Sequence, residues 1–251
     1  MTEEILATSK LSRSFGGVLA VREVTLSVPR GQLRAIIGPN GAGKTTLFNL
    51  LTGELRCDGG RILFKGADIT GRPPHYLCRH GLARTFQINS IFLSATVFEN
   101  VQLAILAHRG QTWNPLASAR RLAVGETEEI LERLGLAHEA DKPGGTLSYG
   151  DRRRLEVALA LAGKPELLLL DEPTSGMSLS EKPALVELIR SVAKEKNVTT
   201  VLIEHDMGVV FSVSDRITVM HQGTVLAAGT PGEIQVNARV QEVYLGEERH
   251  A

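Results

Sequence analysis

With 251 residues, the chain has the length of one large domain or of a domain with an inserted lobe, and its composition is ordinary for a soluble globular protein. Its 28 basic residues (Lys and Arg) balance 28 acidic ones (Asp and Glu), so bulk charge does not attract nucleic acid and no nucleic-acid partner is expected.

Cys57 and Cys78 lack metal-site spacing, and we expect reduced thiols in the cytosol. The start of the chain is not expected to be a signal peptide. No apolar run approaches the roughly 20 residues of a membrane helix, so another chain would have to span any membrane.

The first third of the sequence predicts antiparallel strands followed by a strand, a loop and a helix. Apolar and polar residues alternate, and Gly-rich or Pro-containing turns separate the alternating runs. A helix is expected to begin near Lys44, directly after a Gly-rich loop. The predicted strands cover residues 5–15, 18–28, 33–37 and 61–65.

The middle of the chain, from about residue 88 to 160, has helical spacing and predicts no strand. Its expected helices cover residues 99–108, 126–134 and 152–162. Strands and helices then alternate again, with strands over 167–170, 198–203, 216–220 and 224–228 and helices over 181–195 and 240–245. The whole pattern predicts an α/β core into which a helical lobe is inserted.

The loop 38–45 carries the clearest chemical signal. It reads G-P-N-G-A-G-K-T and matches the phosphate-loop pattern G-x-x-x-x-G-K-[ST], for which a chance match in a chain this long is on the order of one to two per cent. Glycines let backbone N–H groups turn inward around phosphate oxygens, and the next helix directs its positive dipole end at the anion. Lys44 is then expected at the β- and γ-phosphates and Thr45 on Mg²⁺. A Gly-rich turn with an exposed Lys is the alternative.

Two adjacent carboxylates, Asp171 and Glu172, end the apolar run 167–170. Acids at the end of a buried strand need a partner, which a Mg²⁺ ion would supply. Asp171 is predicted to hold the metal through water, and Glu172 to polarise the water that attacks the γ-phosphate. Solvated acids at a strand end are the alternative, which the phosphate loop upstream disfavours.

Four further features, in a fixed order, resemble those of ABC ATPases. Residues 147–151, Leu-Ser-Tyr-Gly-Asp, resemble the ABC signature and precede the acid pair by that family's spacing. Gln87 matches the Q-loop, His205 matches the switch histidine, and Phe15 lies where the family keeps an aromatic residue that stacks on adenine. Taken singly, such a Gln, His or Phe is typical of polar surface or core. The ordered set covers essentially the whole chain and is far more specific.

The resemblance implies a fold and its division. It implies a P-loop NTPase (RecA-like) α/β core with an antiparallel β subdomain and an inserted helical subdomain, all within one ABC ATPase domain over residues 1–251. The nucleotide-binding core would comprise 1–87 and 161–251, and the helical signature subdomain 88–160.

It also implies a mechanism in which two ATP-binding subunits sandwich two ATP molecules. Ser148 and the Gly150 backbone N–H of one subunit would contact the γ-phosphate held by Lys44 of the other. His205 would contact the same phosphate, and Gln87 would sense metal and nucleotide. The resemblance thus assigns catalysis to Glu172, His205 and Lys44, and metal binding to Thr45, Gln87 and Asp171. Its nucleotide-binding set is Phe15, Gly38, Pro39, Asn40, Gly41, Ala42, Gly43, Lys44, Thr45, Thr46, Gln87, Ser148 and Gly150.

The chain departs from the usual family pattern at three positions. Tyr149 stands where most ABC proteins have Gly, Asp151 where they have Gln, and Ser178 where many relatives have Asp. No role is assigned to Ser178. The basic run 152–154 after the signature is expected to be a solvated helix face, with phosphate contact as the alternative.

Several segments are similar to those of ATP subunits of branched-chain amino acid importers, namely 81–87, 97–101, 147–150, 176–177, 229–231 and 243–247. Urea importers and lipopolysaccharide exporters share much of the pattern. The resemblance implies ATP and Mg²⁺ as cofactors, and a position on the cytoplasmic face of the inner membrane. Its expected partners are a second ATP-binding subunit (identical or paralogous), transmembrane permeases and a periplasmic binding protein.

Two other functions are possible for an ABC ATPase of this kind. A soluble ABC protein acting on DNA or ribosomes, or an ATP-holding module without turnover, fits less well than a transport ATPase. The single phosphate loop, balanced charge and intact catalytic residues disfavour both. The apolar residues 91–93 and 97–98 are expected either to dock the membrane subunits or to pack inside the helical lobe.

Overall fold

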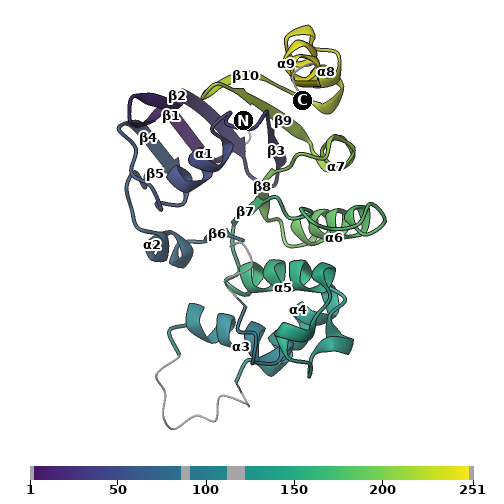
Figure 1. Cartoon of the computed structure of the whole chain (residues 1–251). Coiled ribbons are helices and arrows are strands. Elements are labelled where there is room, and N and C mark those ends of the chain that lie inside the picture. The colour runs from purple at the N-terminus through teal and green to yellow at the C-terminus, as the bar shows by residue number, and fades with distance from the viewer. Residues whose placement is uncertain (1–2, 86–90, 112–121, 249–251) are drawn as a thin grey trace.

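The computed structural model in Figure 1 describes residues 3–85, 91–111 and 122–248, and within these ranges it has two sheets. The antiparallel sheet has the order β2-β1-β4-β5, and the second, six-stranded sheet has the order β10-β9-β3-β8-β7-β6. The first contains β1 (Glu4–Phe15), β2 (Val18–Pro29), β4 (Gly59–Phe64) and β5 (Ala67–Asp68). The second contains β3 (Leu33–Ile37), β6 (Leu82–Arg84), β7 (Leu167–Asp171), β8 (Thr199–Ile203), β9 (Arg216–His221) and β10 (Thr224–Gly229).

Adjacent strands of the six-stranded sheet run parallel, except that β10 is antiparallel to β9. The sheet is covered on both faces, which explains the uninterrupted Leu run of β7. Leu167 and Leu169 pack in one core with Phe48, whereas Leu168 and Leu170 pack in the other core with residues such as Leu155 and Ile189. Successive side chains of a strand point to opposite faces, so the four leucines serve both cores.

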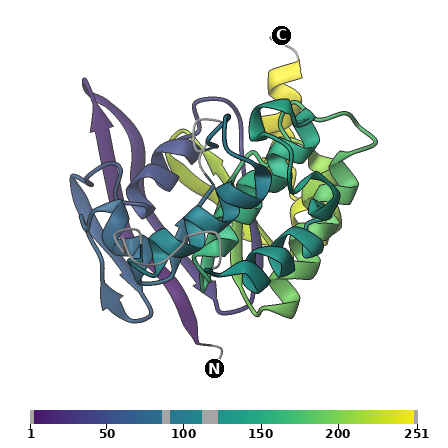
Figure 2. The same cartoon turned by 90° about the horizontal axis from the view of Figure 1, so that it is seen from below.

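Three of the helices form a group of their own at one end of the molecule. The α-helices are α1 (Lys44–Leu51), α2 (Pro74–Arg79), α3 (Val97–His108), α4 (Val124–Arg133), α5 (Tyr149–Ala162), α6 (Lys182–Glu195), α7 (Met207–Val213), α8 (Pro231–Gln235) and α9 (Ala238–Glu248). Short 3₁₀ turns cover Ala137–Glu139 and Gly144–Thr146. Helices α3, α4 and α5 pack together at one end of the molecule, at the bottom of Figure 1 and towards the viewer in Figure 2. None of the helices in the described ranges combines the length and the apolar character needed to cross a membrane.

The α/β fold with its antiparallel sheet is confirmed, and the differences from prediction lie at element ends and in short elements. Helix α3 begins at Val97, two residues before the predicted start, because Thr96 and Glu99 form a capping box ahead of it. Helix α5 begins at Tyr149 because Ser148 is its N-cap. Sequence periodicity did not predict β5, β6, α2, α7 and α8, which span two to seven residues and are too short for a periodic signal.

The expectation of a solvated basic face on α5 was wrong for its central residue. Arg153 is 8% exposed and donates hydrogen bonds to Glu156 Oε2 at 2.8 Å and to Tyr149 Oη at 2.7 Å. Arg152 donates to the Gly145 carbonyl at 2.6 Å. Position 153 faces inward, and an arginine is tolerated there because Glu156, one turn away, compensates its charge.

Candidate functional site

The site lies at the carboxyl ends of three neighbouring parallel strands, where ligands bind in open α/β sheets. Strand β3 leads into the phosphate loop, β7 ends in the acid pair, and β8 leads to His205. In the sheet β8 lies between the other two, and Ile203 pairs with Ile36 on one side and Asp171 on the other. The sheet topology therefore brings the phosphate loop, the acid pair and His205 to the same edge, although they are far apart in the sequence.

The phosphate loop has the backbone that its glycines predict. Gly41 and Gly43 have φ angles of 77° and 96°, in the left-handed region that glycine adopts most readily. A Cβ atom on Gly43 would lie 2.2 Å from the Ala20 carbonyl oxygen, so a side chain does not fit there. The loop is thus pressed against β2 and held in its shape before α1 begins at Lys44.

Lys44 is held inside this loop. Its side chain is buried, and its Nζ donates to the carbonyl oxygens of Gly38 at 2.6 Å and Pro39 at 2.9 Å. The ammonium charge therefore sits within the curve of the loop, at the positive end of α1, where no acidic residue occupies the first turn. This arrangement suits an anion such as a phosphate group. Asn40, Gly41 and Thr45 of the loop are exposed, whereas Pro39 and Ala42 are buried and Thr46 is half-buried.

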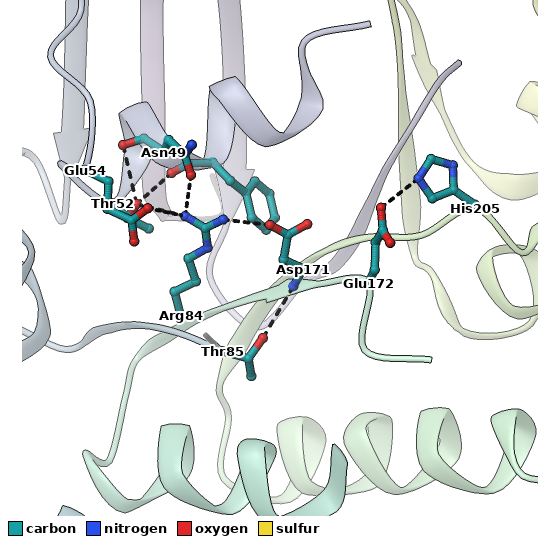
Figure 3. A network of polar contacts seen from close by, with 9 residues as sticks. Asn49, Thr52, Glu54, Arg84, Thr85, Asp171, Glu172 and His205 are labelled. Carbon is teal, nitrogen blue, oxygen red and sulfur yellow. Dashed lines mark hydrogen bonds and ion pairs between the residues drawn. The ribbon is translucent and has the colours of Figure 1, made fainter. Parts of the chain in front are cut away.

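Asp171 ends β7 and forms a buried ion pair. Its side chain is 3% exposed, and Arg84 Nη2 donates to its Oδ2 at 2.6 Å (Figure 3). The other side of the guanidinium binds residues at the end of α1 and just beyond it, with Nη1 donating to Asn49 Oδ1 at 2.6 Å and to Glu54 Oε2 at 3.0 Å. The predicted metal carboxylate is thus fixed by an arginine that the sequence analysis did not single out.

Glu172 has an unusual backbone for a side chain of its size. Its φ angle is 49°, in the left-handed region, and its N–H donates to the Ile203 carbonyl at 3.0 Å. Such strained positions cost about 1–3 kcal/mol and cluster at functional sites. The turn carries the carboxylate away from the strand and towards His205, whose Nε2 lies 2.9 Å from Glu172 Oε1 (Figure 3). Both side chains remain partly exposed, as a group that must reach water requires.

A second missed residue, Glu204, fixes the loops that carry this pair. Its side chain is buried, and Oε1 accepts hydrogen bonds from the Thr174 N–H at 2.9 Å and the Thr174 hydroxyl at 2.8 Å. Its Oε2 accepts from the His205 N–H at 3.2 Å. Its position, directly after the apolar run of β8 and next to His205, is the one sequence signal that marks it as a buried acid in need of partners.

Beyond His205, Asp206 caps α7 and accepts a hydrogen bond from Lys182 Nζ at 3.0 Å. That hydrogen bond, together with one from the Val209 N–H, lowers the pKa of the Asp206 carboxyl. The segment that carries His205 is therefore tied to α6 as well as to α7.

The signature residues form their own contacts, away from the phosphate loop. Ser148 Oγ accepts from the Asp151 N–H at 3.1 Å and donates to Asp151 Oδ2 at 2.7 Å, so it caps α5. Tyr149 packs on Gly176, where an added Cβ would lie 2.7 Å from the tyrosine oxygen. The φ angle of Gly176 is 78°, so glycine is needed there for both space and backbone conformation. The tyrosine that departs from the family pattern thus connects α5 to the loop after Glu172.

Of the predicted site residues, the structure brings Glu172 and His205 into contact but leaves the signature apart from the phosphate loop. Figure 1 shows α5 separated from α1, with strands of the six-stranded sheet between them. Phe15 ends β1 with 44% exposure, and the Arg13 guanidinium lies 4.9 Å from its ring centroid. Gln87 lies outside the described residues.

Two family models match the chain. Residues 21–175 match the ABC transporter model, and residues 224–250 match the model of the branched-chain amino acid ATP-binding cassette transporter. The chain is 43% identical to the high-affinity branched-chain amino acid transport ATP-binding protein BraF of Pseudomonas aeruginosa, over 98% of this chain and 100% of BraF. It is 42% identical to the protein of the same description, LivG, of Escherichia coli K12, again over 98% and 100%.

The fold of the chain is also similar to solved structures of ATP-binding cassettes. The ADP conformation of MJ1267, an ATP-binding cassette of an ABC transporter, has a TM-score of 0.84 and 33% identity, covering 98% of this chain and 100% of that one. A nucleotide-free ATP-binding cassette from an ABC transporter has a TM-score of 0.82 and 32% identity, covering 96% and 98%.

Proposed function

This chain belongs to the ABC transporter family, as an ATP-binding and ATP-hydrolysing subunit, and we propose that it powers the import of branched-chain amino acids. The observation that carries the proposal is the meeting of a phosphate loop, a buried strand-end aspartate and a Glu172–His205 pair at one sheet edge. The cargo follows from similarity, since relatives matched over their full length are named as branched-chain amino acid transport proteins and residues 224–250 match that subfamily's model.

We propose that Mg²⁺ accompanies ATP. The described residues hold no group of three or more His, Cys, Asp or Glu side chains fit for a metal ion. Mg²⁺ typically uses one or two carboxylates together with substrate phosphates and waters. A site made of the Thr45 hydroxyl, ATP and Asp171, which would hold the ion through water, fits the residues present. When bound, the ion would offset phosphate charge. Glu172 would orient and deprotonate the attacking water, with His205 holding the carboxylate in place.

We propose that a second ATP-binding subunit completes each site. Figure 1 shows α5 apart from α1, and this separation supports a role for Ser148 and the Gly150 N–H at a nucleotide bound by another subunit. Ser148 is exposed at the positive end of a 14-residue helix, which suits it for phosphate. ATP would thus join two subunits, and hydrolysis would release them.

Replacing Ser148 tests this composite site, provided that its capping role is controlled. Ser148→Arg is expected to leave ATP binding by the single subunit within about twofold of wild type, while turnover in the assembled transporter falls by about 10²-fold or more, as when one phosphate-stabilising donor is lost. ATP affinity is measured with a fluorescent ATP analogue, and turnover by phosphate release.

The control for capping is Ser148→Asn, because asparagine caps helices as well as serine does, whereas arginine loses about 0.5–2 kcal/mol of cap energy. The asparagine variant should keep wild-type thermal stability yet lose turnover, since its bulk occupies the space for phosphate. Loss of ATP binding by the isolated Ser148→Asn subunit would place Ser148 in its own subunit's site and contradict the proposal.

We propose that membrane permease subunits dock at the helical end of the molecule and hold the chain on the cytoplasmic face of the membrane. Phe92 and Leu93 are 60% and 55% exposed, whereas Ile91 and Val97 are buried in the core. Ile91 and Val97 therefore pack inside the protein, whereas the exposure of Phe92 and Leu93 supports the docking proposal. We further propose the division into a core (1–87 and 161–251) and a helical subdomain (88–160), although α5 continues to Ala162, two residues past that boundary.

An uptake assay tests the cargo. Cells carrying this chain with its membrane permeases and a periplasmic binding protein should accumulate radiolabelled leucine. Cells carrying the Glu172→Gln chain should show only background uptake. Unchanged leucine uptake with the inactive chain, or energised uptake of urea in place of leucine, would contradict the assignment.

A further inference from the structure

We propose that Arg84 is a positioning residue for the metal site, which holds Asp171 in the orientation that binds Mg²⁺ and ties that orientation to the end of α1. The inference rests on the proposed role of Asp171 as a Mg²⁺ ligand. It adds a residue that no phosphate-loop, acid-pair or signature motif contains. Arg84 ends β6, next to β7, and lies 87 residues before Asp171 in the sequence.

A buried carboxylate is costly unless a partner compensates its charge. Asp171 has a 3% exposed side chain and Arg84 a 9% exposed one, so each charge needs a partner. The Arg84 Nη2 contact at 2.6 Å supplies it. The contact uses Asp171 Oδ2 and does not engage Oδ1. The arginine thus restricts the rotation of the carboxylate and leaves Oδ1 for the Mg²⁺ ion or the water that binds it.

Arg84 is held in place independently of its contact with Asp171. Its Nη1 donates to Asn49 Oδ1 at 2.6 Å and to Glu54 Oε2 at 3.0 Å, and its guanidinium lies over the Phe48 ring (Figure 3). Asn49 belongs to α1, the helix that begins at the phosphate-loop lysine. The arginine therefore joins the metal carboxylate to the helix that supports the nucleotide.

The positive charge of Arg84 next to Asp171 has two opposite effects on Mg²⁺ binding. A cation beside a metal ligand can either compete with the metal or orient the ligand. The Glu54 carboxylate offsets the Arg84 charge at 3.0 Å, and the planar guanidinium reaches Asp171 and Asn49 at once, which a point charge cannot do. Orientation therefore outweighs competition. A residue that orients a metal ligand in this way typically changes metal affinity or activity by about 10- to 100-fold when replaced.

The test compares the binding of a fluorescent ATP analogue in EDTA and across a Mg²⁺ titration. For Arg84→Gln, the affinity in EDTA should stay within about twofold of wild type, while the half-saturating Mg²⁺ concentration rises about 10- to 100-fold. Arg84→Lys keeps the charge but loses the forked geometry, so its shift should be intermediate. Arg133→Gln, which removes an arginine that pairs with glutamates on α4 and α6, is the matched control and should show no shift.

Two further variants separate the possible outcomes. Asp171→Asn should raise the Mg²⁺ requirement by itself, and adding Arg84→Gln to it should have little further effect, because Arg84 acts through Asp171. If Asp171→Asn leaves the Mg²⁺ requirement unchanged, the proposed metal site fails. If only Arg84→Gln leaves it unchanged or lowers it, the positioning role alone fails.

Should Arg84→Gln not fold, the double variant Asn49→Ala/Glu54→Gln provides the test. It weakens both close anchors of the arginine on the α1 side and leaves the contact with Asp171 as its main tether. A rise of the Mg²⁺ requirement with unchanged EDTA affinity would support the positioning role. An unchanged Mg²⁺ requirement would overturn it.

Discussion

Glu172→Gln is expected to lower ATP turnover by about 10²- to 10⁴-fold, the usual contribution of a general base. Glutamine keeps the size of glutamate and an oxygen that can accept a hydrogen bond from His205, but it does not take a proton from water. ATP binding should persist, because the carboxylate is carried on a turn after β7 and not on the phosphate loop. The variant should therefore accumulate with uncleaved ATP, measured as phosphate release and as bound nucleotide per subunit.

Glu128→Gln is the matched control, since Glu128 is an exposed glutamate of α4 outside the site. Its turnover should equal that of wild type. A Glu172→Gln chain that keeps full turnover would exclude Glu172 as the base and leave its left-handed backbone without a functional explanation.

Lys44→Ala is expected to weaken ATP binding by about 2–5 kcal/mol, the loss seen when one partner of a buried charge pair is removed. That loss corresponds to a dissociation constant at least about 30-fold higher. Lys44 Nζ lies within the loop, where it donates to the Gly38 and Pro39 carbonyl oxygens. When ATP binds, the ammonium group would exchange these contacts for the phosphates, so its removal takes away a charge at the phosphate site. Isothermal titration of ATP into the purified chain measures the effect.

Lys142→Ala is its control, since Lys142 is an exposed lysine paired with Glu139 outside the site. Unfolding in urea should show that Lys44→Ala remains folded, so that weak binding reports the lost charge. An unchanged ATP affinity in a folded Lys44→Ala chain would refute the role of the phosphate loop.

How much the sequence could predict differs from one part of the site to another, for a physical reason. The loop 38–45 is predictable because its chemistry is local, with glycines and a lysine in consecutive positions. The strand β7 is predictable because burial on both faces demands an unbroken apolar run. The resemblance assigned both Glu172 and His205 to catalysis. Their contact is a result of the topology, because β7 and β8 are adjacent parallel strands that end at the same edge.

Residues that act through distant partners carry a weaker sequence signal or none. Arg84 and Asp171 are 87 residues apart, and one arginine in a three-residue strand has no periodicity to mark it. Glu204 is hidden beside the more conspicuous His205. Arg153 looked like part of a solvated run, because composition does not tell which side of a helix packs inward.

The most direct test of the account is the structure of the Glu172→Gln chain with MgATP, in complex with its transport partners. We predict that the γ-phosphate of ATP bound by Lys44 lies within hydrogen-bonding distance of a signature serine of the neighbouring ATP-binding subunit. ATP held by residues 38–45 with no contact from any second subunit would contradict the composite site.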